Sequence, residues 1–211
     1  MSSIIDALNH PLFQLGNDAV SSAELLGFVT GAVGVWLCVR AQVWNFPIGI
    51  ANNVFFLVLF WSARLYADAA LQVVFLLLGA HGWFQWRWRD GEQGGRRVIG
   101  RAGTAELLWP AALVVPATWL LTVLLTRAHD TAPFWDALTT ALSLAAQWLL
   151  NAKRVQNWYF WVAADLVYVP LYVVKRLDLT ALVYVVFLGM CLVGLRDWRR
   201  QLAVPAAVAA A

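Results

Sequence analysis

The chain has 211 residues, of which 62% are hydrophobic and only 13% charged, and its formal net charge is +3. A soluble domain carries about 25% charged residues, so too few charged side chains are present to cover a soluble surface, and the small net charge gives no indication of a nucleic-acid partner. The composition predicts an all-α membrane protein that crosses the bilayer several times.

Seven apolar segments follow one another along the chain, each close to the roughly 20 residues that a helix needs to cross a bilayer core of about 30 Å. They are residues 23–43, 45–62, 66–88, 104–126, 134–152, 157–175 and 179–198. Pro47 and Pro170 are expected to bend the second and sixth helices. Residues 1–22 are expected to form an extracytoplasmic segment, and the alanine-rich residues 201–211 a disordered cytoplasmic tail.

Lys and Arg are divided unevenly between the two sides of the predicted bundle. Four lie on one side: Arg64, Arg127, Lys175 and Arg176. Eleven lie on the other: Arg40, Arg87, Arg89, Arg96, Arg97, Arg101, Lys153, Arg154, Arg196, Arg199 and Arg200. The positive-inside rule therefore predicts an external N-terminus and a cytoplasmic C-terminus. The basic, Gly-rich residues 89–103 are interpreted as a cytoplasmic connector rather than a phosphate or nucleic-acid contact.

The sequence matches itself at an offset of 112 residues. The match pairs Trp36 with Trp148, Asn45 with Asn157, Arg64 with Arg176, Gly82 with Gly194 and Trp86 with Trp198. Residues 23–88 and 134–200 are therefore predicted to be duplicated three-helix units, with the basic loop and a connector helix between them at 89–133. One intervening helix gives both units the same direction, and such 3+1+3 parallel repeats are typical of transporters that rock around a central site.

Polar and ionisable groups within a bilayer are costly and usually face the bundle interior or a cavity. The candidate binding residues are Asn53, Gln72, Trp83, Trp86, Gln147, Asn157, Trp161, Asp165, Tyr168 and Tyr184. Aromatic rings stack on flat ligands and attract cations, and amides bind hydroxyls. The set therefore favours a flat, hydroxylated ligand that can carry positive charge. A structural role for Asp165, and a helix–helix hydrogen bond for Gln147, stay open alternatives.

The sequence gives little support for a metal site, a membrane redox enzyme or a retinal-type receptor. Cys38 and Cys191 both lie in apolar runs, without disulfide or metal-ligand spacing. His10, His81 and His129 cannot form paired haem ligands, and the last helix has no Lys for a retinal Schiff base. We expect neither a cofactor nor an enzyme activity.

Four motifs carry a family resemblance: LYADAALQ (65–72), GWFQW (82–86), NWYFW (157–161) and TALVY (180–184). Together with the repeat, they resemble the PnuC family of bacterial vitamin transporters over about residues 23–198. The resemblance implies a SWEET-like fold, often trimeric, in the bacterial inner membrane. It implies facilitated diffusion of nicotinamide riboside, or of thiamine or riboflavin in relatives, with trapping by a cytoplasmic kinase.

By motif position, the resemblance makes Asn157 and Trp161 substrate contacts and Gln72, Trp83 and Trp86 cavity residues. Some nicotinamide riboside carriers have Asn-Ile-Tyr-Gly-Trp where this chain has the segment 79–83, Gly-Ala-His-Gly-Trp, and an Asn in place of Asp165. The sequence favours uptake of nicotinamide riboside. Thiamine, riboflavin and, more remotely, a sugar as in SWEET carriers are the alternatives. The lack of a second acid or base along the path argues against proton coupling.

Overall fold

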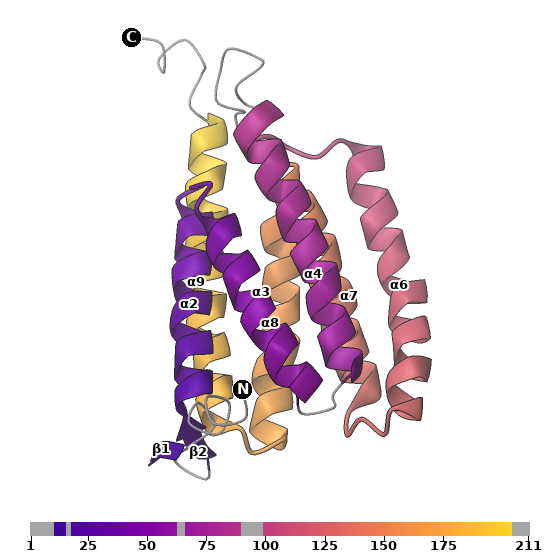
Figure 1. The fold of residues 1–211 in the computed structure, drawn as a ribbon. Coiled ribbons are helices and arrows are strands. Elements are labelled where there is room, and N and C mark those ends of the chain that lie inside the picture. Colours follow the sequence, from indigo (N-terminus) through magenta and orange to yellow (C-terminus); the bar gives the residue numbers. More distant parts are fainter. Residues whose placement is uncertain (1–10, 16–17, 63–65, 90–98, 204–211) are drawn as a thin grey trace.

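The protein is a bundle of seven long helices, seen in a computed structural model that describes residues 11–15, 18–62, 66–89 and 99–203 (Figure 1). The helices are α2 (Ser22–Val39), α3 (Asn45–Ser62), α4 (Tyr66–Phe84), α6 (Thr104–Arg127), α7 (Pro133–Asn151), α8 (Asn157–Val174) and α9 (Asp178–Ala203). A π-helical turn, η1 (Gln85–Arg89), prolongs α4. The prediction of a seven-helix, predominantly helical protein is confirmed.

Six of the helices form a closed ring. Contacts run from α2 to α3, α4, α7, α8, α9 and back to α2, whereas α6 lies outside the ring against α7 (Figure 1). We call α2–α4 the first triplet and α7–α9 the second triplet. The two seams between the triplets, α2 with α9 and α4 with α7, are the sparsest contacts of the ring. Helix α6 follows the first triplet and precedes the second in the chain.

Within the described part of the chain, three helical spans are long and apolar enough on their own to cross a bilayer: Ala69–Trp88, Thr104–Arg127 and Asp178–Ala203. Helices α2 and α3 carry the shorter apolar stretches Leu25–Val39 and Asn45–Val58. Helix α7 is not among these spans. It is buried between its neighbours, and its small or hydroxylated side chains, such as Ala141, Ser143 and Ala145, let the neighbouring helices approach closely.

An antiparallel β-hairpin, β1 (Pro11–Leu15) paired with β2 (Asp18–Ser21), precedes α2. The sequence did not predict it. At the other end of the chain, α9 continues through Ala203, so the predicted disorder of 201–203 is wrong. The remaining tail, 204–211, lies outside the described residues, as do most of the basic connector at 90–98 and residues 1–10.

Helix α2 ends at Val39, four residues before its predicted end. Ala41 has a φ of 51°, and its N–H donates to the Cys38 carbonyl, while the Gln42 N–H donates to the Leu37 carbonyl. This pattern is the left-handed cap that closes many helices. Glycine usually occupies that position, and because this chain has Ala41 there, the sequence did not indicate that the helix ends at Val39. Lys153 (φ 53°) caps α7 in the same way, 112 residues later.

Other contacts also recur at this offset. The Trp86 Nε1–H donates to the Asn151 carbonyl at 3.0 Å, and the Trp198 Nε1–H donates to the Val39 carbonyl at 3.0 Å. Each bond joins the third helical segment of one triplet to the end of the first helix of the other. The two triplets therefore contact each other in the same manner from both sides.

Gly194 is packed directly against the indole of Trp158, where an added Cβ would overlap the ring. Gly194→Ala is therefore expected to lower the free energy of unfolding by about 1–3 kcal/mol, since overpacking forces neighbours apart. Thermal unfolding in detergent measures this. Gly189→Ala on the same helix is the matched control, because nothing lies within 4 Å of its added Cβ. Equal melting temperatures for both variants would contradict the expectation.

Candidate functional site

A cavity of about 420 Å³ lies within the ring, bounded by residues from all six ring helices. This volume is in the range of small-molecule sites. None of the described residues of α6 lines it.

Seven of the ten predicted binding residues line this cavity: Asn53, Gln72, Gln147, Trp161, Asp165, Tyr168 and Tyr184. They come from α3, α4, α7, α8 and α9, so residues far apart in the sequence are brought together around one cavity. Their contact with a ligand stays a prediction.

Positions 112 residues apart face the same cavity but carry different chemistry. The pairs are Gly49 with Trp161, Asn53 with Asp165, Phe56 with Tyr168, Gln72 with Tyr184 and Phe75 with Phe187. Four of these five pairs differ: the second triplet supplies an indole, the acid and two phenols where the first supplies a glycine, an amide, a phenyl ring and a second amide, whereas Phe75 and Phe187 are identical. An added Cβ at Gly49 would meet nothing within 4 Å, so open space adjoins this part of the lining.

Asp165 is 4% exposed and accepts a hydrogen bond from the Cys191 thiol, with Sγ 3.4 Å from Oδ2. Among the described residues that line the cavity, it is the one carboxylate, and none is Lys, Arg or His. A buried carboxylate without a cationic partner is unfavourable. The cavity therefore favours a ligand that brings positive charge.

An aromatic wall continues from Asp165 toward the end of the bundle near the hairpin. The rings of Tyr168 and Tyr184 are 4.4 Å apart, Tyr172 stacks on Tyr168 at 5.6 Å, and Tyr184 meets Phe187 edge-on at 5.6 Å. These rings come from α8 and α9 and offer faces to a flat ligand.

Gln147 makes its side-chain hydrogen bond within α7, so the helix–helix bond considered from the sequence is made by Asn151 instead. Gln147 lines the cavity, and its Nε2 donates to the Asn151 Oδ1 at 3.0 Å, while the Asn151 Nδ2 donates to the Leu78 carbonyl on α4 at 2.8 Å. The α4–α7 seam is thus joined through Asn151, and Gln147 supports that joint from one turn away.

Three predicted residues lie outside the cavity lining. Asn157 is fully buried, and its Nδ2 donates to the Arg154 carbonyl at 2.6 Å, so it supports the turn before α8; its contact with substrate stays a prediction. Asn45 makes the equivalent bond to the Gln42 carbonyl. Trp86 is buried between the triplets, and Trp83 is 38% exposed on α4. The motif position in α8 suggested Asn157, but its side chain is not part of the cavity lining, whereas that of its neighbour Trp158 is.

Sequence reasoning missed Trp158, which lines the cavity next to its predicted neighbours. Its indole N–H is buried and donates to none of the described residues. Its counterpart at the 112-residue offset, Phe46, also lines the cavity. Applying the offset to every aromatic residue would have found this pair.

A ring of apolar helices around a cavity of amides, aromatic rings and one acid defines a polytopic membrane protein with a candidate small-molecule site. Residues 21–200 match the family described as "Nicotinamide mononucleotide transporter". The chain belongs to this family of membrane transporters.

Relatives of known function support the assignment. The chain is 25% identical to the nicotinamide riboside transporter PnuC of Escherichia coli, covering 93% of this chain and 92% of the relative. It is 26% identical to the riboflavin/roseoflavin transporter RibM of Streptomyces davaonensis, covering 90% and 91%. The crystal structure of the vitamin B3 transporter PnuC shares the fold, with a TM-score of 0.59, 21% identity, and coverage of 85% of this chain and 80% of that one.

Proposed function

We propose that this protein takes up nicotinamide riboside by facilitated diffusion. The central cavity carries the proposal, because it offers aromatic faces, amides and a single carboxylate. Nicotinamide riboside presents a flat cationic ring, a carboxamide and ribose hydroxyls, which match those groups. Membership of the transporter family and the similarity to PnuC support the same substrate.

Riboflavin is the second candidate, because RibM is as similar to this chain as PnuC. Asp165 favours nicotinamide riboside, since a carboxylate balances the charge of its cationic ring but can only accept hydrogen bonds from the neutral riboflavin. Thiamine, which carries a cationic thiazolium, is compatible with the same acid. A sugar, the remotest alternative, is neutral and would use the acid only as a hydrogen-bond acceptor.

In the proposed site, Trp161, Tyr168 and Tyr184 stack on the ligand ring and Asp165 balances its charge. Asn53, Gln72 and Gln147 bind the carboxamide and the hydroxyls. To the residues predicted from sequence we add Trp158 as a donor. Trp161 is partly buried and adjoins the aromatic core of the bundle, so its ring is held in place before the ligand arrives.

We further propose that residues 23–88 and 134–200 are parallel repeats in a SWEET-like 3+1+3 arrangement, with 89–133 as their connector. The recurring caps, indole bonds and lining positions support this arrangement. Rocking of the two triplets would open the cavity alternately to either side. The ligand shifts that balance only by its differential affinity for the two states.

The charge distribution supports a bacterial inner-membrane orientation with the N-terminus outside and the C-terminus cytoplasmic. We call the end of the bundle that holds Arg40, Arg87, Lys153, Arg154 and Arg199 the basic end, and we place it in the cytoplasm. From the family resemblance we propose a homotrimer and a cytoplasmic kinase that traps the substrate by phosphorylation.

Purified protein in liposomes tests the transport proposal. Uptake of labelled nicotinamide riboside is expected to saturate, to stop at equal concentrations inside and outside, and to be the same with or without a pH gradient. Thiamine, riboflavin and glucose serve as the comparison substrates. Accumulation above equilibrium would exclude facilitated diffusion, and uptake of riboflavin alone would assign the second candidate function.

A further inference from the structure

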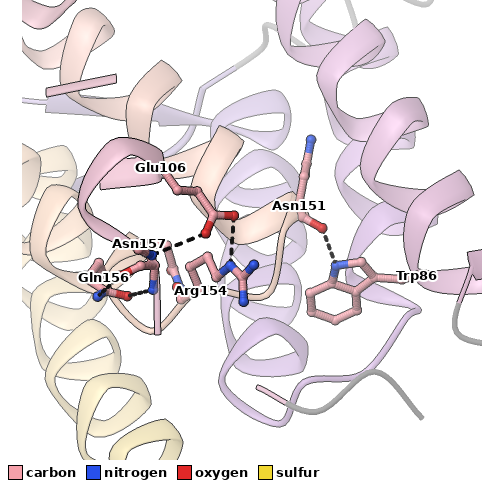
Figure 2. Close-up of polar contacts among 8 residues, drawn as sticks. Trp86, Glu106, Asn151, Arg154, Gln156 and Asn157 are labelled. Carbon is pink, nitrogen blue, oxygen red and sulfur yellow. Dashed lines mark hydrogen bonds and ion pairs between the residues drawn. The ribbon is translucent and has the colours of Figure 1, made fainter. Parts of the chain in front are cut away.

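The two seams of the ring are closed at the basic end by a matched pair of hydrogen bonds. Figure 2 shows one of them, from the Trp86 indole to the Asn151 carbonyl, and the Trp198 indole makes the other to the Val39 carbonyl. Both bonds measure 3.0 Å. The first spans the α4–α7 seam, and the second spans the α2–α9 seam.

Both acceptors are carbonyls from the last turn of a helix, which have no partner within their own helix. Val39 and Asn151 are each 1% exposed, so protein must satisfy these carbonyls while the seam is closed. The indoles do so from the opposite triplet. When the seam opens, water can replace the indole at each carbonyl, which makes the bonds reversible.

The same two indoles belong to an aromatic plug between the cavity and the basic end. Trp86 meets Phe46 edge-on at 4.9 Å, and Trp198 meets Trp158 edge-on at 5.5 Å. Phe46 and Trp158 line the cavity. The two indoles are 6.4 Å apart across the middle of the bundle. The plug therefore fills the space through which a substrate would leave the cavity at this end.

Polar contacts join α6 to the second triplet. Glu106 of α6 pairs with Arg154 at 2.8 Å, and the Ala102 N–H donates to the Gln156 Oε1 at 2.8 Å (Figure 2). These contacts join α6 to the turn before α8, so α6 belongs with the second triplet. The two seams are then the boundaries at which a rocking motion must open.

We propose that Trp86 and Trp198 are paired latches that hold the cavity closed at the basic end. The proposal rests on transport through this cavity and assigns the residues that control its exit. Each latch acts on the position of the triplets and does not touch the substrate. Release of the substrate at the basic end requires both indole bonds to break.

Two native reporters allow the latches to be tested. Cys38 and Cys191 are the chain's two cysteines, and both line the cavity. Their reaction with a charged, membrane-impermeant maleimide is measured in inside-out and right-side-out vesicles without substrate. The variants are Trp86→Phe, Trp198→Phe and the double variant, which keep an aromatic ring but lose the N–H. Trp88→Phe is the control, because Trp88 is 54% exposed and lies outside the cavity lining.

Labelling from the basic end is expected to rise roughly twofold to tenfold in each single variant and further in the double variant, as loss of one net hydrogen bond predicts. The control should label like the wild type. An unchanged rate from both faces in a folded double variant would overturn the proposal. So would an equal rise from both faces with a lowered melting temperature, which indicates a merely structural role.

The readout needs no substrate, so failure of nicotinamide riboside transport leaves the latch test intact. A rise confined to the external face would support the latch and reverse the proposed membrane orientation.

Discussion

Asp165→Asn is expected to weaken binding of nicotinamide riboside at least tenfold, about 1.4 kcal/mol. The substitution keeps the size of the side chain and removes its charge. It also keeps an oxygen that can accept the Cys191 thiol hydrogen bond, so the fold should be retained. Calorimetry or ligand-induced thermal shift on the purified protein measures the change.

The sharpest comparison uses two ligands of nearly the same shape. Dihydronicotinamide riboside has a neutral ring in place of the cationic pyridinium. Its affinity should be similar in the wild type and in Asp165→Asn, so the preference for the oxidised ligand should fall with the charge. Cys191→Ala, which keeps the carboxylate, is the matched control and should retain the preference. An equal loss for both ligands would assign Asp165 a structural role.

Trp161→Ala is expected to weaken binding at least tenfold, about 1.4 kcal/mol or more, because it removes an aromatic ring from the cavity lining on which the ligand would stack. Both nicotinamide riboside and its neutral form should lose affinity, unlike in Asp165→Asn. Trp161→Phe, which keeps a ring, should recover part of the loss. Wild-type affinity in Trp161→Ala would remove stacking at this position from the proposed site.

Asn157→Ala is expected to affect stability rather than ligand affinity, in contrast to Asp165→Asn and Trp161→Ala. Its amide bonds the Arg154 carbonyl and lies outside the cavity, so the variant should lose stability while the remaining folded protein binds with nearly wild-type affinity. Melting temperature and affinity measured on the same sample separate these effects. A tenfold loss of affinity at unchanged melting temperature would restore Asn157 as a substrate contact.

Helix positions were largely predictable because a bilayer constrains length and apolarity together. The seven predicted spans agree with the seven helices to within a few residues at most ends. The end of α2 was missed because Ala41 adopts a conformation that usually signals glycine. The hairpin before α2 was missed because its short strands carry no long periodic pattern.

The cavity was predictable from the 112-residue offset, since residues that share a place in each triplet converge at the centre. The offset could not distinguish residues that line the cavity from residues that support the turns between helices. Asn45 and Asn157 are identical at equivalent positions, yet only Asn45 is part of the lining. That difference depends on how each helix begins relative to the cavity, which periodicity alone does not define.

Helix α6 lies outside the ring, and its position bears on how such a site could evolve. Under the proposed duplication, a cavity formed by two separate, identical triplet chains would have the same side chains on both sides. An aspartate contributed by one triplet would then also be contributed by the other. Two carboxylates facing one small cavity repel each other, and one is driven to the neutral form. A single extra crossing allows both copies to be fused in one gene without inverting either. The side chains that each triplet contributes to the cavity can then change independently, as the equivalent residues Asn53 and Asp165 illustrate.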